Sequence, residues 1–112
     1  MSFATFDIVV VPFPYSDKLA EKRRPALVIS APGVGEALDR LWVAMITTDR
    51  GHRLLGDALI GDLESAGLPA ESLVRASKIA TIEVDRVLRR AGRLSDRDLV
   101  AATEALRACS GF

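Results

Sequence analysis

The 112-residue sequence has a single cysteine, Cys109, and a single histidine, His52. One cysteine cannot form an intrachain disulfide, which is typical of a protein that works in a reducing compartment. A site that needs several clustered histidine or cysteine ligands is not indicated, so we expect no metal ion and no cofactor. We expect the histidine on the surface and the cysteine within the packing of a helix.

The sequence also lacks an excess of charge of either sign, because 15 basic residues balance 15 acidic residues. A strongly basic domain is the usual sign of nucleic-acid binding, so the net charge gives no such indication. The distribution of charge is uneven, however. Lys22, Arg23 and Arg24 lie together, and residues 86–97 hold five arginines against one acid. A neutral protein can therefore still carry a basic face.

Long hydrophobic runs are a third feature that the sequence lacks. No segment approaches the roughly 20 apolar residues of a membrane span, and the N-terminus shows no secretion signal. We therefore expect a cytoplasmic protein that contacts no membrane.

The length fits one domain over residues 1–112, which would bury only about two-thirds of its unfolded surface. Self-association would add burial, and Trp42 is expected in the core or at such an interface.

Short apolar runs rich in β-branched residues, separated by polar or turn-forming segments, fill most of the chain. Strands are predicted over residues 7–11, 25–30, 42–48, 57–60 and 72–79, with a weaker strand over 81–84. Because proline cannot donate a hydrogen bond to a strand ladder, Pro12 should end the first strand and Pro25 should begin the second.

The C-terminal segment has a different pattern. Ser95 followed by Asp98 is typical of a helix N-terminus, and apolar residues at helical spacing predict a helix from Ser95 to Ser110. Gly111 is predicted to end this helix. Five or more short strands with one terminal helix predict a mainly β protein folded as a small β-barrel.

The chemistry that remains available is that of arginine and hydroxyl groups. Pro25 biases Arg24 towards an extended backbone, and a guanidinium can bind phosphate oxygens through two hydrogen bonds. Thr47 and Thr48 end the third predicted strand, and Arg75 lies in another strand. RNA supplies its own nucleophile, because its 2′-OH can attack the neighbouring phosphate when positive charge and donors surround it. Such a reaction needs neither a metal nor a cysteine.

Several blocks of the sequence resemble, in the same order, toxins of the MazF/PemK type. These blocks are residues 6–17, residues 22–30 with an Arg-Pro step, residues 43–48, residues 67–69 with 72–75 and 78–79, and residues 92–96. The resemblance implies an SH3-like β-barrel, a homodimer and metal-independent, sequence-selective cleavage of single-stranded RNA. It also implies a cognate antitoxin protein that occludes the RNA groove.

The same resemblance implies roles for individual residues. Arg24 matches an arginine that stabilises the scissile phosphate, and Thr47 matches a threonine that assists this step. Arg75 matches an arginine that serves some members as general acid or phosphate contact. Unpaired RNA stacks its bases on aromatic side chains beside a basic groove. The residues expected to bind RNA are Phe13, Tyr15, Arg23, Thr48, Arg50, His52, Arg53 and Lys78.

Two departures from the family pattern leave the proton-transfer groups open. Some members carry an acid two residues after the last arginine, where this sequence has Ser77, and others carry a histidine in the first loop, which here has none. Asp17 or Glu21 could supply the missing proton-transfer group.

Two alternative functions exist on the same fold, namely a CcdB-like poison of DNA gyrase and a noncatalytic module that binds nucleic acid or protein. The Arg24–Pro25 step and the threonine favour the nuclease.

Overall fold

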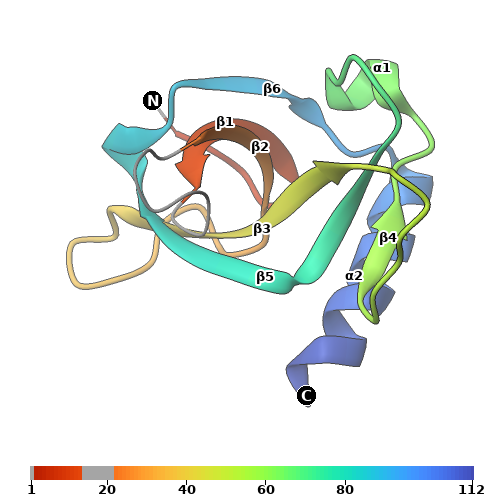
Figure 1. Ribbon diagram of the computed structural model, residues 1–112. Helices are drawn as coiled ribbons and strands as arrows, with labels where there is room; N and C mark the ends of the chain where they lie inside the picture. The colour runs from red at the N-terminus through yellow and green to blue at the C-terminus, as the bar shows by residue number, and fades with distance from the viewer. Residues whose placement is uncertain (1, 14–21) are drawn as a thin grey trace.

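The computed structural model describes residues 2–13 and 22–112, which form a curled β-sheet with a C-terminal helix (Figure 1). The elements are β1 (Asp7–Phe13), β2 (Lys22–Val28), β3 (Arg40–Thr48), β4 (Asp57–Leu59), α1 (Leu63–Ala66), β5 (Ser72–Glu83), the 3-10 helix η1 (Val84–Arg86), β6 (Arg89–Arg93) and α2 (Asp96–Ser110). The sheet order is β4-β5-β3-β2-β1-β6, and every pairing is antiparallel. A mainly β fold with a C-terminal helix is thus confirmed.

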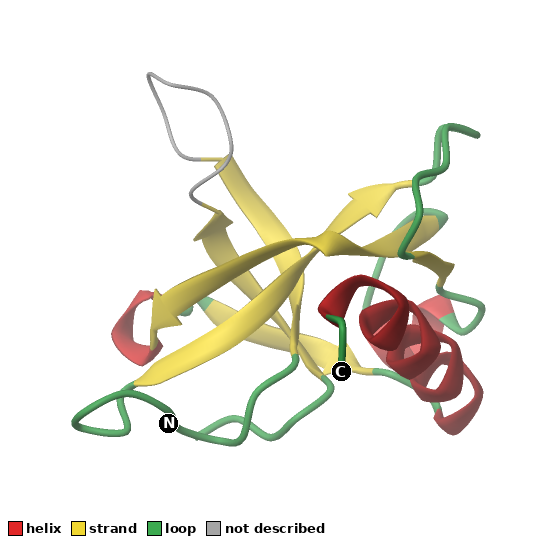
Figure 2. Cartoon of the chain, turned by 90° about the horizontal axis from the view of Figure 1, so that it is seen from below, coloured by secondary structure: helices red, strands yellow, loops and turns green. Residues whose placement is uncertain are grey.

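The sheet curls into a barrel-like shape, and no ladder joins its edge strands β4 and β6 within the described residues. One hydrophobic cluster consists mainly of strand residues such as Val9, Val11 and Val28, and Val84 of η1 packs against it. A second cluster packs the opposite face, including Ile8, against α1 and Ala102 of α2. Figure 2 shows α2 lying against one side of the sheet. Residues 26–28 of β2 and 43–46 of β3 are buried on both faces of the sheet, which explains why these stretches are continuously apolar.

Two prolines lie inside strands, contrary to the sequence prediction. β1 continues through Pro12, and Pro25 is within β2 rather than at its start. β1 pairs with β6 only as far as Val10, and β2 pairs with β3 only from Ala26 onwards. Each proline therefore lies where its strand has a neighbour on one side only. Because no described strand lies on the other side, the sheet loses no hydrogen bond through the missing N–H of proline.

β5 is one strand of 12 residues, not the two strands that the sequence predicts. Its pairing with β3 is irregular, because Ala44 is opposite Ile79 whereas Met45 is opposite Arg75. Residues 76–78 therefore bulge from the ladder. The bulge bends β5 and allows one strand to span both halves of the curled sheet.

The sequence prediction missed β6 and α1. β6 contains arginine, alanine and glycine but no β-branched or aromatic residue, so its pairing with β1 overrides its low propensity. α1 is a single turn that begins after Asp62 and ends at Gly67, whose φ is 71°. Gly92 lets α1 approach β6, because a Cβ at this position would collide with the backbone of Ser65 and Ala66.

The beginning and end of α2 agree with the sequence prediction. The Ser95 side chain accepts a hydrogen bond from the Asp98 N–H at 3.3 Å, and Gly111 follows the helix with a φ of 78°. The buried Asp98 carboxylate accepts the N–H groups of Gly61 at 2.8 Å and Asp62 at 2.9 Å. These bonds fix the start of α2 to the turn that follows β4. No helix in the described part of the chain is long and apolar enough to cross a membrane.

Candidate functional site

A pocket of about 200 Å³ opens where β2 and β3 approach the turn before β5. Its lining consists of Arg23, Arg24, Pro25, Ile46, Thr47, Thr48, Leu68, Pro69, Ala70 and Ser72. The β2–β3 ladder ends at the pair of Ala26 and Met45, and Arg24 and Thr47 each lie two residues beyond this pair. The arginine and the threonine singled out from the sequence therefore share one pocket.

The described lining of this pocket carries positive charge without a compensating carboxylate. Its only ionisable side chains are those of Arg23 and Arg24, and neither forms an ion pair with a described residue. Thr47 and Thr48 add two hydroxyl groups, whereas the Ser72 hydroxyl already donates to the Ala70 carbonyl at 2.8 Å. A guanidinium beside hydroxyl donors is an arrangement that suits a phosphate group.

Arg75 lies on the same face of the sheet, one residue pair from the pocket. Thr47 is opposite Leu73 and Met45 is opposite Arg75, so Arg75 is the diagonal neighbour of Thr47. Such neighbours have Cα atoms about 7–8 Å apart, which long side chains can span. The structure therefore places Arg75 near Thr47, although Arg75 does not line the pocket that Thr47 shares with Arg24.

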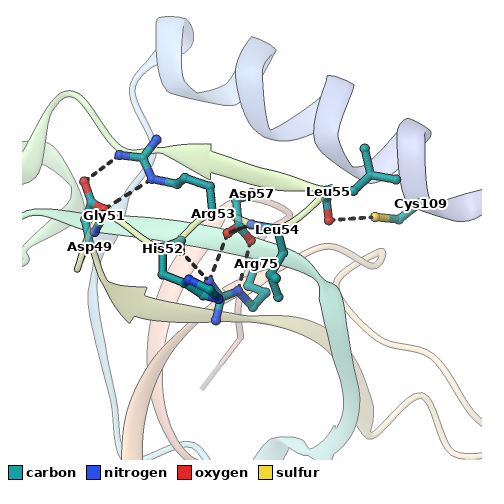
Figure 3. Close-up of polar contacts among 9 residues, drawn as sticks. All are labelled: Asp49, Gly51, His52, Arg53, Leu54, Leu55, Asp57, Arg75 and Cys109. Atoms are coloured by element: carbon teal, nitrogen blue, oxygen red, sulfur yellow. Dashed lines mark hydrogen bonds and ion pairs between the residues drawn. The ribbon is translucent and has the colours of Figure 1, made fainter.

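The Arg75 guanidinium forms a two-point ion pair with Asp57 of β4 (Figure 3). Its Nε donates to Oδ1 at 3.0 Å and its Nη2 donates to Oδ2 at 2.9 Å. Nη2 also donates to the His52 carbonyl at 3.4 Å. The Asp57 side chain is 2% exposed and that of Arg75 is 15% exposed, so most of the pair is shielded from water.

This pairing stabilises both charges. The hydrogen bonds from Arg75 lower the pKa of the Asp57 carboxyl, and the Leu54 N–H lowers it further. The hydrogen bonds to Asp57 raise the pKa of Arg75 above its ordinary value. A proton transfer from Arg75 near neutral pH is thereby disfavoured, which leaves phosphate contact as the chemistry that this side chain can offer.

The loop between β3 and β4 contains three of the residues predicted to bind RNA. Arg53 is held by Asp49, whose carboxylate accepts Nε at 3.2 Å and Nη2 at 2.8 Å as well as the Gly51 N–H at 3.0 Å. The Gly51 hydrogen bond and the Arg53 ion pair lower the pKa of Asp49. Arg50 and His52 are exposed, and none of the three predicted residues lines the pocket.

The sequence model of the family described as "PemK-like, MazF-like toxin of type II toxin-antitoxin system" matches residues 4–109. The chain belongs to this family. The resemblance inferred from the sequence is therefore confirmed. No curated protein matches the sequence.

Solved structures of MazF toxins share the fold of this family member. MazF from Deinococcus radiodurans has a TM-score of 0.76 at 16% identity, covering 100% of this chain and 99% of that one. The Mycobacterium tuberculosis toxin MazF-mt6 has a TM-score of 0.72 at 24% identity, covering 95% and 97%. A mycobacterial endoribonuclease in complex with its cognate antitoxin has a TM-score of 0.75 at 17% identity, covering 98% and 96%.

Other residues named from the sequence lie elsewhere in this MazF-like fold. Phe13 ends β1, and Lys78 is exposed in the bulge of β5. Ser77, at the position where some family members carry an acid, lies in the same bulge and lines a different cavity. Three of the named residues lie outside the described part of the chain: Tyr15, Asp17 and Glu21.

Sequence reasoning missed a larger groove and the role of Asp57. The groove has a volume of about 940 Å³ and lies between the C-terminal half of α2 and the sheet. Its lining is Ile29, Trp42, Leu55, Ala76, Ser77, Ile79, Thr103, Leu106, Arg107, Ala108, Cys109, Ser110 and Phe112. Trp42 is 50% exposed and Ile79 is 41% exposed there. In the sequence only Trp42 was expected in the core or at an interface, whereas Asp57 was interpreted only as the first residue of a strand.

Proposed function

We propose that this family member is a metal-independent endoribonuclease that cleaves single-stranded RNA at selected sequences. The observation that carries the proposal is the pocket that Arg24 and Thr47 line together, with no carboxylate among its described lining. An uncompensated guanidinium beside a hydroxyl can stabilise the charge that develops on a phosphate under attack. Membership of the MazF-like toxin family supports the same activity.

In the proposed reaction the 2′-OH of one nucleotide attacks the adjacent phosphorus. A bond from the 2′-oxygen to phosphorus forms, the bond to the 5′-oxygen breaks, and the proton lost by the 2′-OH is balanced by one gained at the 5′-oxygen. The products are a 2′,3′-cyclic phosphate and a 5′-OH end. Arg24 and the Thr47 hydroxyl bind the non-bridging oxygens, where one such donor contributes about 100- to 1000-fold in kcat.

RNA binding extends beyond the two groups that contact the scissile phosphate. Arg23 and Thr48 line the same pocket and contact the neighbouring backbone. Exposed Arg50 and His52 reach adjacent phosphates from the loop between β3 and β4. These contacts are chiefly electrostatic, so binding should weaken as the salt concentration rises. Because the substrate is cellular RNA, we place the activity in the cytoplasm.

Two protein partners belong to the proposal. The groove beside α2 exposes Trp42 and Ile79 together, and apolar surface of this kind marks a protein interface. We assign it to a second copy of the chain, which makes the active form a homodimer. The second partner is a cognate antitoxin that covers the basic pocket. MazE–MazF complexes from Deinococcus radiodurans have the same toxin fold, with TM-scores of 0.74 and 0.73.

The test is incubation of the purified, antitoxin-free protein with several long single-stranded RNAs in excess chelator. The matched variants are Arg24→Ala and Asp39→Asn, which breaks an exposed 2.8 Å ion pair with Arg40 at the other end of β3. We expect discrete fragments from the wild type and Asp39→Asn but none from Arg24→Ala. Intact RNA in every lane, with inhibition of gyrase supercoiling in a parallel assay, would favour a gyrase poison instead.

A further inference from the structure

We propose that Asp57 is a positioning residue of the nuclease site, which holds the Arg75 guanidinium ready to bind an RNA phosphate beside Thr47. The inference rests on the proposed function and deepens it, because it assigns a role to a strand that contributes nothing to the Arg24 pocket. β4 has only three residues, and Asp57 is the first of them.

The geometry of the ion pair leaves one edge of the guanidinium available. Asp57 engages Nε and Nη2 of Arg75, and Nη2 also reaches the His52 carbonyl. Nη1 has no hydrogen-bond partner among residues 2–13 and 22–112. The pair therefore fixes the plane of the guanidinium while leaving two N–H groups for a ligand. A fixed donor of this kind binds phosphate without a further loss of side-chain entropy.

The position of the pair on the sheet places Arg75 beside the proposed site. Arg75 is the diagonal neighbour of Thr47 and shares its face of the sheet. The bulge at residues 76–78 begins immediately after Arg75 and ends its regular pairing with β3. Bulges often re-aim a side chain next to an active site. An RNA phosphate bound at Thr47 would lie within reach of Arg75.

The same carboxylate also organises the RNA-binding loop. Asp57 Oδ2 accepts the Leu54 N–H at 2.7 Å, and Arg75 donates to the His52 carbonyl (Figure 3). One carboxylate thus connects β5 to the loop that carries Arg50. A structural role alone does not require this arrangement, since a shielded ion pair can often be replaced by apolar residues without loss of stability.

Asp57 acts through Arg75 and transfers no proton. Both of its oxygens already accept hydrogen bonds, and those from Arg75 hold the pKa of the Asp57 carboxyl below its ordinary range. Removal of the carboxylate should leave Arg75 charged but free to move. RNA should still bind, whereas the phosphorane should be stabilised less well. The expected signature is a fall in kcat with little change in affinity.

The experiment compares full-length wild type, Asp57→Asn, Arg75→Ala and the double variant, with Asp39→Asn as the control. Affinity is measured with an all-2′-deoxy oligonucleotide of the cleaved sequence, kcat is measured with RNA, and melting temperatures show which variants are folded. We expect Asp57→Asn to lower kcat about 10- to 100-fold with affinity changed less than about threefold. The double variant should have the same kcat as Arg75→Ala.

Wild-type kcat in Asp57→Asn would overturn the inference while leaving the proposed nuclease intact. A parallel loss of kcat, affinity and melting temperature would also overturn it, because that result describes a structural residue. If Asp57→Asn does not fold, the variant Asp57→Glu replaces it, because glutamate keeps the charge but displaces the carboxylate. A reduced kcat of Asp57→Glu at unchanged affinity supports the inference, whereas a wild-type kcat overturns it. A wild type that cleaves no RNA overturns the inference together with the proposed function.

Discussion

Arg24 and Arg75 lie on the same face of the sheet but differ in how their charge is balanced. Arg24 is half-buried in the pocket with Thr47 and has no ion-pair partner among the described residues. Arg75 is held at two points by the Asp57 carboxylate. The comparison separates two contributions that arginine can make to phosphate chemistry, namely an uncompensated charge and a fixed orientation.

The difference has consequences for both stability and binding. An arginine without a carboxylate partner contributes little to folding, so its loss should affect function first. An arginine that neutralises a shielded carboxylate contributes to folding as well as to function, because its removal leaves the carboxylate without a partner. The variants below are arranged to separate these effects, from the largest expected change to the smallest.

The largest effect is expected at the uncompensated charge. Arg24→Ala should lower kcat/KM for RNA by about 100- to 1000-fold, because it removes a donor to the developing phosphorane. Its free energy of unfolding should change by no more than about 0.5 kcal/mol, as for surface substitutions. Initial rates and urea denaturation measure the two quantities. A loss of stability in proportion to the loss of rate would contradict the account.

The compensated arginine should show the larger effect on folding. Arg75→Ala leaves the Asp57 carboxylate shielded and unpaired, so the free energy of unfolding should fall by about 2 kcal/mol, below the 3–5 kcal/mol of a fully buried pair. The double variant Arg75→Met with Asp57→Leu should recover most of this loss without recovering activity. Urea denaturation is the measurement. Equal stability of Arg75→Ala and Arg24→Ala would remove the distinction between the two residues.

The next-largest effect is expected in the pH dependence of stability, to which Arg75 contributes through Asp57 and Arg24 does not. Arg75 lowers the folded-state pKa of Asp57, so the ion pair stabilises the protein fully above the unfolded pKa of about 3.9. This contribution is lost as the pH falls through the lower folded-state pKa. Melting temperatures between neutral and strongly acidic pH should fall less steeply for Asp57→Asn than for the wild type. Arg24→Ala should keep the wild-type slope, and identical slopes for all three would refute the expectation.

The smallest effect is expected in the loop between β3 and β4. Arg50 is exposed, whereas Arg53 is engaged by Asp49. Arg50→Ala should weaken binding of a 2′-deoxy oligonucleotide a few-fold and reduce the salt dependence by about one released counterion. Arg53→Ala should alter the salt dependence less. Affinities at several salt concentrations provide the test. A larger change in salt dependence for Arg53→Ala than for Arg50→Ala would show that the ion pair with Asp49 does not limit the contribution of Arg53 to binding.

The sequence predicted those parts of the molecule that depend on local pattern. β-branched runs placed most strands, Ser95 marked the start of α2, and the Arg-Pro step drew attention to Arg24. Apolar periodicity and capping act over a few residues, so they can be read along the chain. The proximity of Arg24 and Thr47 was suggested only by their common resemblance to one family.

The features that the sequence did not predict depend on pairing between distant strands. Pro12 is compatible with β1 only because β6 does not reach it, and β6 itself exists through its pairing with β1. The Asp57–Arg75 pair requires β4 beside β5 in one register. A single-residue slip would turn the two side chains to opposite faces. Composition cannot specify such a register, so Asp57 could not be singled out.

The central claim is that RNA is cleaved by its own 2′-OH under charge stabilisation from this pocket. The most direct test uses an RNA of the cleaved sequence with a single 2′-deoxy nucleotide at the cleavage position, incubated with the wild type in excess chelator. The account predicts that this one substitution abolishes cleavage, whereas the all-ribose RNA yields a 2′,3′-cyclic phosphate. Cleavage of the substituted RNA at the same bond would contradict it, because another nucleophile would have to attack the phosphate.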